Sequence, residues 1–310
     1  MVDLSEVLKR LPDLGNMAPA LKDVRAARTA VAPFIAGDSV AAVAEAVAQA
    51  QQRGVGASVQ FLPEPGSEAA SRLLHLQLIS ALGEADLAAG TDLTIDLSLL
   101  GVRAPQATAG ERADLRATLG AAEAAGMTVT LSGLSSTTVD AGLELLAELA
   151  PAHPDLGVTL AAQLHRSEAD CRQLAETGTR VRLVKRGPRE AGDAVLSSAH
   201  DVDKAYVRCL RQLIEGGART WVATEDPRML EITGALAERA DDPAEPTFLF
   251  RRGLEPADTA RLVAEGARIV ILEPFGPGWV DYVAAQIAPS AASVGKAARS
   301  ALGVGRGSGE

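Results

Sequence analysis

The sequence predicts an α/β fold, a (β/α)8 barrel of the TIM type, on three observations. Short apolar runs alternate with amphipathic segments, which is typical of parallel strands joined by helices. Eight such strand segments can be counted, and the repeating region is close to the ~250 residues typical of these barrels. No Gly-x-Gly-x-x-Gly turn follows the first strand, and this disfavours the main alternative, an open doubly wound sheet.

Each expected strand is a run of about five mostly apolar residues. The expected strands lie at 57–62, 93–99, 127–132, 157–162, 180–185, 220–225, 247–252 and 267–273. The helices expected after them lie at 67–89, 110–125, 137–150, 167–177, 199–216, 227–239, 256–265 and 278–288. We therefore expect a helical N-terminal arm over 1–33, the barrel over 34–290, and a C-terminal helix with a disordered Gly-rich tail over 291–310.

Composition narrows the classes of partner and the location. The 310 residues are 47% apolar and 23% charged, with a net charge of −10 and a pI near 5.0. This acidic balance argues against a nucleic-acid partner. No apolar run reaches the ~18 residues of an integral membrane span, and the N-terminus does not resemble a signal peptide, so we expect a cytoplasmic protein. Cys171 and Cys209 are expected to be buried thiols in a reducing compartment.

The active site of such a barrel lies at the C-terminal ends of its strands. The residues expected there are Glu64, Asp96, Ser132, Ala161, Lys185, Glu225, Arg251, Arg252 and Glu273. The stretch 181–190 is the most informative, because Arg182 and Lys185 put charge in and just after a buried strand. These two cations either contact an anionic or electron-rich ligand or pair with acids on neighbouring strands.

Two neighbouring charges, Arg251 and Arg252, form a second candidate anion site. Strand alternation lets only one of them point into the barrel. Because Glu225 and Glu273 end the flanking strands, we expect a salt bridge between one of these arginines and one of these acids.

The sequence shows no metal site and no activated nucleophile. His165 and His200 lack a second ligand at metal-binding spacing. Ser132, Ser135 and Ser136 have no partner histidine or lysine at a recognisable spacing. We therefore assign no catalytic residue.

Four stretches in order resemble the proline dehydrogenase family, flavin-dependent barrels that oxidise L-proline to Δ1-pyrroline-5-carboxylate. VRLVKRGPRE (181–190) resembles the family's fifth strand and VATEDPRML (222–230) its sixth. LVAEGARIVILEPFG (262–276) resembles the eighth strand, and WVDYVAAQIA (279–288) the last barrel helix. The resemblance implies FAD as the cofactor. The positions assigned to cofactor contact on this resemblance are Arg182, Val184, Lys185, Ala223, Thr224 and Asp226, and Tyr282 is assigned to substrate contact. Arg251 and Arg252 are added as substrate contacts because they form the candidate anion site described above, not because of the resemblance.

Most of the family's other active-site positions are substituted. The Arg-Arg pair and the glutamate of the last helix are replaced by Ala285, Gln286 and Pro289. The remaining substituted positions carry Asp96 for lysine, Ser132 for aspartate, Ala161 for glutamine, Glu225 for histidine, Leu272 for tyrosine, and Arg186-Gly187-Pro188 for Gly-Ala-Tyr. Bidentate arginines are the strong partners of a carboxylate, so their loss predicts loss of proline binding.

Three hypotheses follow. The first is a proline dehydrogenase-like protein whose catalysis is lost or strongly reduced, with weak or absent FAD and a binding role, its partner being an active homologue. The second is a working flavoenzyme with a different anionic substrate, held by Arg251 or Arg252. The third is an active proline dehydrogenase, which would need an arginine on the last helix; the nearby candidate, Arg299, lies beyond the barrel.

Overall fold

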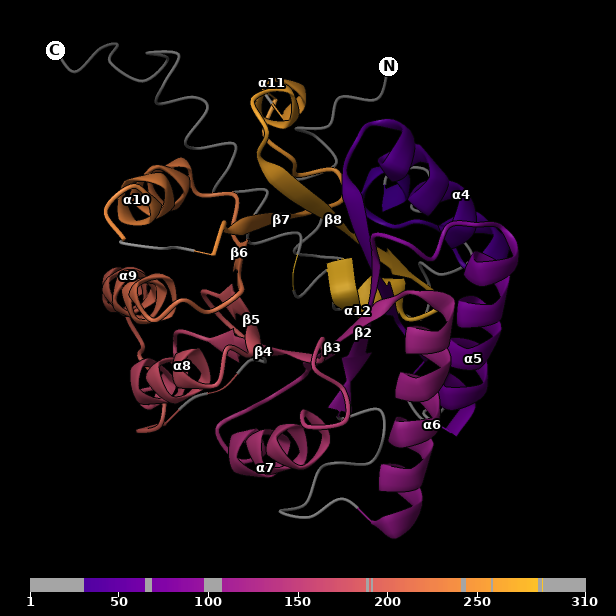
Figure 1. Ribbon diagram of the computed structural model, residues 1–310, viewed down its shortest axis with the longest axis horizontal. Helices are drawn as coiled ribbons and strands as arrows, with labels where there is room; N and C mark the ends of the chain where they lie inside the picture. Colours follow the sequence, from indigo (N-terminus) through magenta and orange to yellow (C-terminus); the bar gives the residue numbers. More distant parts are fainter. Residues whose placement is uncertain are drawn as a thin grey trace, which may run out of the picture.

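A closed barrel of eight parallel strands organises the molecule, as predicted (Figure 1). The computed structural model describes residues 31–64, 69–97, 108–187, 190, 192–240, 244–257, 259–283 and 286. The strands are β1 (Gly56–Phe61), β2 (Thr91–Asp96), β3 (Thr128–Ser132), β4 (Gly157–Ala161), β5 (Arg180–Val184), β6 (Thr220–Ala223), β7 (Thr247–Arg251) and β8 (Arg268–Phe275). Because β1 pairs with both β2 and β8, the barrel has no free edge.

Helices surround the barrel and connect its strands (Figure 1). They are η1 (Ala32–Phe34), α4 (Val40–Gln52), α5 (Ala69–Glu84), α6 (Ala109–Ala125), α7 (Val139–Leu149), α8 (Ser167–Glu176), α9 (Ala199–Glu215), α10 (Pro227–Ala237), α11 (Thr259–Ala264) and α12 (Trp279–Tyr282). Among the described residues, none of these helices has the length and apolar character needed to cross a membrane. Residues 1–30 and 287–310, which hold most of the predicted arm and all of the predicted tail, lie outside the described residues.

Helix α6 shows how local sequence sets the boundaries of an element. Thr108 is its N-cap and forms a capping box with Glu111, so two otherwise unpaired backbone donors are satisfied. Gly126 ends the helix at φ 83°, a left-handed conformation that favours glycine. The next strand can therefore start two residues later, at Thr128.

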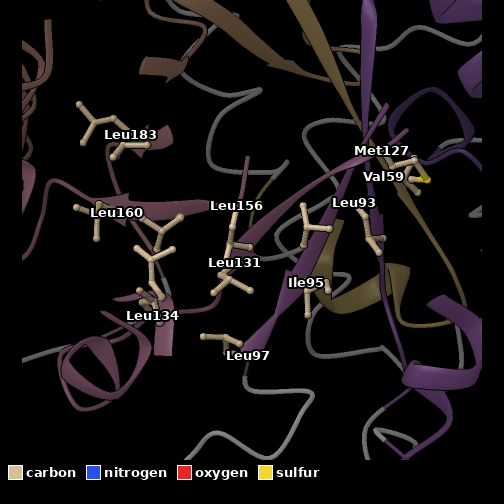
Figure 2. Close-up of a cluster of buried hydrophobic side chains, with 14 of the residues drawn as sticks. Val59, Leu93, Ile95, Leu97, Met127, Leu131, Leu134, Leu156, Leu160 and Leu183 are labelled. Carbon is tan, nitrogen blue, oxygen red and sulfur yellow. The ribbon is translucent and has the colours of Figure 1, made fainter. Parts of the chain in front are cut away.

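The main hydrophobic core lies between the strands and the helices. Outward-facing strand residues such as Leu93 and Ile95 join helix residues such as Leu78 and Leu82 in one cluster. Figure 2 shows part of this cluster, from Val59 and Leu93 to Leu160 and Leu183. These side chains alternate along each strand with those that face the barrel interior.

The barrel interior is different in character. Its apolar part is a small cluster of Leu249, Val270 and Leu272, against which Trp221 and Ala223 pack. Most of the remaining interior positions on β1, β2, β3 and β5 are polar or charged, such as Asp92 and Arg182. The helix-covered side of the sheet therefore supplies most of the apolar packing.

A cavity of about 520 Å³ opens at the N-terminal ends of the strands, opposite the mouth. Its lining includes Gly56, Gly90 and Gly126, which contribute no side chain, together with Asp92 and Trp221. Active sites of these barrels lie at the other end. We therefore assign the candidate site to the interior and the mouth.

Candidate functional site

The deepest feature of the site is a buried carboxylate, Asp92, shared by two arginines of β5. The Nη2 atom of Arg180 lies 2.9 Å from Asp92 Oδ1, and the Nη2 atom of Arg182 lies 2.9 Å from Asp92 Oδ2. The hydroxyls of Ser58 and Thr130 also donate to Asp92, each at 2.8 Å. Strands β1, β2, β3 and β5 are thus joined across the barrel.

The charge states of this cluster follow from burial and pairing. Burial opposes ionisation of Asp92, but Arg180, Arg182 and the hydroxyl donors outweigh it and hold the pKa of Asp92 below its usual value. Burial, only partly offset by Asp92, lowers the pKa of Arg182 to about 10. Arg182 therefore stays charged at neutral pH, and it shares the Asp92 carboxylate with Arg180.

Trp221 of β6 completes the interior cluster. Its ring lies 4.5 Å from the Arg180 guanidinium carbon and 5.4 Å from that of Arg182. Such cation–π contacts favour the charged guanidinium in a desolvated place. The Arg182 Nη1 also donates to Thr94 at 2.9 Å, and its Nε has no hydrogen-bond partner among the described residues. Most hydrogen-bond donors of the Arg182 guanidinium are therefore used in contacts within the protein.

Lys185 lies just beyond β5, at the mouth. Its Nζ is 2.7 Å from a carboxylate oxygen of Asp203 on α9 and 2.7 Å from one of Asp226, the N-cap of α10. Asp226 also accepts from the backbone N–H of Arg228 at 3.1 Å and donates its own N–H to Thr224 Oγ1 at 3.1 Å. Lys185 thereby ties the end of β5 to the start of α10.

Arg251 is paired with Glu225, as predicted. The Arg251 Nε donates to Glu225 Oε1 at 2.9 Å, and its Nη2 contacts the other carboxylate oxygen. The Arg251 Nη1 donates to the carbonyl oxygen of Gln286 at 2.6 Å. Burial works against the Arg251 charge, but the hydrogen bonds that Arg251 donates to Glu225 prevail, and the pKa of Arg251 is raised. Tyr282, close by, has a buried hydroxyl without a hydrogen-bond partner among the described residues, and burial raises its pKa.

Arg252 makes a second pair, with Glu273, at a different place. The Nη1 of Arg252 lies 2.8 Å from Glu273 Oε2. Arg252 lines a second cavity of about 380 Å³ with Gly37, Glu45 and Trp279, whereas Arg251 shares its strand face with interior Leu249. As expected, only one of the two arginines serves the barrel interior. Burial raises the pKa of Glu273 although Arg252 opposes it.

The segment after β5 lies over the end of β4. A Cβ on Gly187 would lie 3.1 Å from the Cβ of Ala161, so the two backbones are close. Farther along, a Glu190 carboxylate oxygen accepts from the backbone N–H of Ser136 at 2.8 Å. Leu164 and Val195 form an isolated antiparallel bridge. The chain itself therefore covers the ends of β3 and β4. Pro188 lies outside the described residues.

Comparison with known proteins gives a consistent family. No family model matches the chain. Proline dehydrogenase 1 of Bacillus subtilis is 25% identical over 263 residues, which cover 82% of this chain and 85% of the relative. The proline dehydrogenase of Deinococcus radiodurans is 27% identical over 264 residues, covering 82% and 84%.

These similarities support a divergent relative of the proline dehydrogenases.

Solved structures agree on the fold. Proline utilization A of Bdellovibrio bacteriovorus, inactivated by N-propargylglycine, superposes with a TM-score of 0.71 at 19% identity, over 82% of this chain and 32% of that one. A proline utilization A with proline bound in remote sites gives 0.66 at 16% identity, over 84% and 31%. The chain thus spans about a third of these larger proteins, and the likeness shows the barrel.

The structure brings together several of the residues that the resemblance to proline dehydrogenases implies. Lys185, Thr224 and Asp226 lie together around the exit of β5, and Tyr282 lies close enough to Arg251 to be affected by its charge. Val184 and Ala223 are paired in register on β5 and β6 and are half-buried. Arg252 is set apart from this group by strand alternation.

The residue that sequence analysis missed is Asp92. The second strand spans Thr91–Asp96 rather than the predicted 93–99, so it begins two residues earlier and includes Asp92. The expectation that Arg182 pairs with an acid on a neighbouring strand was wrong in that detail, because β5 is bonded to β4 and β6 whereas Asp92 is on β2. The alternation of Asp92, Thr94 and Asp96 was the available signal.

Proposed function

We propose that this chain is a proline dehydrogenase-like barrel with lost or strongly reduced proline oxidation, which binds FAD weakly or not at all and acts as a binding protein. The observation that carries the proposal is that the cations at the candidate site are held by acids of the same chain. Arg182 is paired with Asp92, Lys185 with Asp203 and Asp226, and Arg251 with Glu225.

A flavin fits these residues poorly. Three of the five donors of the Arg182 guanidinium contact Thr94, Ser58 and Asp92, below the mouth. Ala161 offers no amide where the family has a glutamine, and Gly187 lies against it. Glu225 puts a negative charge where the family has a histidine. Each change removes a polar partner from the ring or its surroundings.

Proline fits poorly for a related reason. A zwitterionic amino acid needs fixed cations for its carboxylate. Gln286 occupies one family arginine position, and its carbonyl oxygen already accepts a hydrogen bond from Arg251. Asp96, at the end of β2, replaces a lysine and repels a carboxylate. Losing one member of a buried charge pair costs about 2–5 kcal/mol of binding, so losing several cations should abolish useful affinity.

The test is a visible spectrum of the purified chain, followed by dye reduction with L-proline and with or without added FAD. Proline dehydrogenase 1 of Bacillus subtilis serves as the positive control in the same assay. We expect a colourless protein and no proline-dependent dye reduction. A yellow protein that reduces the dye only with proline would contradict the proposal and restore an active proline dehydrogenase.

A matched variant tests the pairing itself. Glu225→Gln keeps the size of the side chain but removes its charge, so Arg251 would become available to an anion. We expect calorimetry to detect carboxylate binding by the variant at concentrations where the unchanged chain shows none. If the unchanged chain binds proline or another carboxylate equally well, internal pairing is not what closes the site.

A further inference from the structure

Two buried cysteines outside the candidate site lie on adjacent helices. Cys171 is on α8 and Cys209 is on α9, both are fully buried, and both belong to the cluster between strands and helices. Helices α8 and α9 flank β5, the strand that carries Arg180 and Arg182. The proposed function uses neither thiol.

Cross-helix contacts place the two cysteines at the same level. On one side, Arg208 of α9 donates to Glu168 of α8 at 2.9 Å. On the other side, the Nε of Arg172 donates to Gln212 at 3.2 Å. In sequence, Cys171 lies between Glu168 and Arg172 on α8, and Cys209 lies between Arg208 and Gln212 on α9. The parallel alignment of α8 and α9 therefore brings them side by side.

Small residues let the two helix backbones approach closely. One turn beyond Cys171, Ala175 lies against Gly216, the C-cap of α9. A Cβ on Gly216 would lie 2.6 Å from the Cβ of Ala175, closer than side-chain carbons can come. Disulfides need Cα atoms of the two residues within about 7 Å, and this close packing suits that distance.

The neighbouring Cys209 thiol and burial both raise the pKa of Cys171 well above its usual value. Both cysteines are free thiols. A thiol with a raised pKa is a slow nucleophile at neutral pH, so exchange requires a transient separation of α8 and α9.

We propose that Cys171 and Cys209 form an intramolecular disulfide that fastens α8 to α9 when the protein meets a small-molecule disulfide oxidant. One protein thiolate attacks the oxidant disulfide, forming a mixed disulfide and releasing one small thiol. The second protein thiolate then attacks the protein sulfur of the mixed disulfide and releases the second small thiol. The protein pair is oxidised by two electrons, the oxidant disulfide is reduced, and the two protons end on the released thiols.

The experiment uses the full chain, folded, with oxidised glutathione. After incubation, the protein is denatured, treated with iodoacetamide without reductant, and weighed by mass spectrometry. We expect a product two hydrogen atoms lighter than the reduced chain, without alkylation at Cys171 or Cys209, and restored to two alkylation sites by prior reduction. Two alkylated cysteines, or glutathione adducts only, would overturn the proposal.

Two comparisons make the result specific. Cys171→Ser and Cys209→Ser each leave one thiol, so at most a glutathione adduct forms on the other. The unchanged chain oxidised in denaturant shows how fast the disulfide forms without native packing. If it forms as fast in denaturant as in the folded chain, the packing of α8 against α9 does not direct it. The oxidised folded chain should unfold at higher denaturant, because the cross-link restrains the unfolded chain. A lower midpoint would show that the bond strains the helices and would also count against the proposal.

Discussion

The two faces of the barrel sheet are built on opposite principles. The outer face is continuous apolar packing between strands and helices. The inner face of β1, β2, β3 and β5 carries Asp92, two arginines and several hydroxyls, all buried. Apolar packing tolerates substitutions of similar volume, whereas a charged cluster depends on every member being present.

The difference between the two faces indicates that the charged residues of the inner face have a structural role in this chain. Arg182 belongs to a position that the family resemblance links to flavin, yet its contacts here hold the barrel together. A residue kept at a cofactor position therefore does not by itself imply a cofactor. The inner face retains its charges because removing one leaves another uncompensated.

The largest expected effect is at the centre of the inner face. Asp92→Asn leaves two buried guanidiniums without a counter-charge, so we expect the free energy of unfolding to fall by about 3–5 kcal/mol. Urea denaturation followed by circular dichroism measures it. Asp114→Asn, which removes an exposed partner of Arg72, is the control and should cost no more than ~1 kcal/mol. Equal losses in both variants would refute the structural role of Asp92.

The outer face is tested by a cavity. Leu131 is fully buried among the side chains of Figure 2, and Leu131→Ala should lower the free energy of unfolding by about 2–5 kcal/mol. Leu131→Met, which nearly conserves volume, should cost less than about 1.5 kcal/mol. If both substitutions cost the same, packing on this face is looser than the structure indicates.

A buried histidine on α5 predicts a pH dependence. Burial lowers the pKa of His75 to about 4 from 6.5. The unfolded chain then binds more protons than the folded chain between these values, so stability falls as pH decreases through this window, by roughly 3 kcal/mol in total. His75→Phe should flatten the profile, and His165→Gln, at an exposed position, should not. An unchanged slope in His75→Phe would exclude His75 as the source.

The smallest effect is expected at the Arg252–Glu273 pair. Arg252→Gln leaves Glu273 buried, and we expect a loss of about 1–2 kcal/mol at pH 7. Because the pKa of Glu273 is already raised by burial, its protonation on acidification should relieve part of this loss. Arg261→Gln, in an exposed helical pair with Glu265, should change stability by ~0.5 kcal/mol or less. A loss in Arg252→Gln that grows towards pH 5 would contradict this account.

The fold was predictable from the sequence because the periodicity of apolar residues is a local property. The ion pairs in the barrel interior were only partly predictable. Glu225 and Glu273 could be placed beside Arg251 and Arg252, since the ends of adjacent strands meet in a barrel. The partner of Arg182 could not, because it depends on which strands face each other across the bore. Asp92 follows Gly90 and Thr91, and a polar residue at a strand start looks like part of the turn.

The placement of the two tryptophans has a practical consequence. Trp221 lies in the barrel interior between charged groups, and Trp279 is buried with Leu62 and Val280 in a separate cluster. The sequence contains no other tryptophan. Indole emission responds to nearby charge and solvent, so each ring is a fluorescent probe of its own region. Single Trp→Phe variants would let spectroscopy follow the charged interior and the α12 region separately during unfolding or ligand titration.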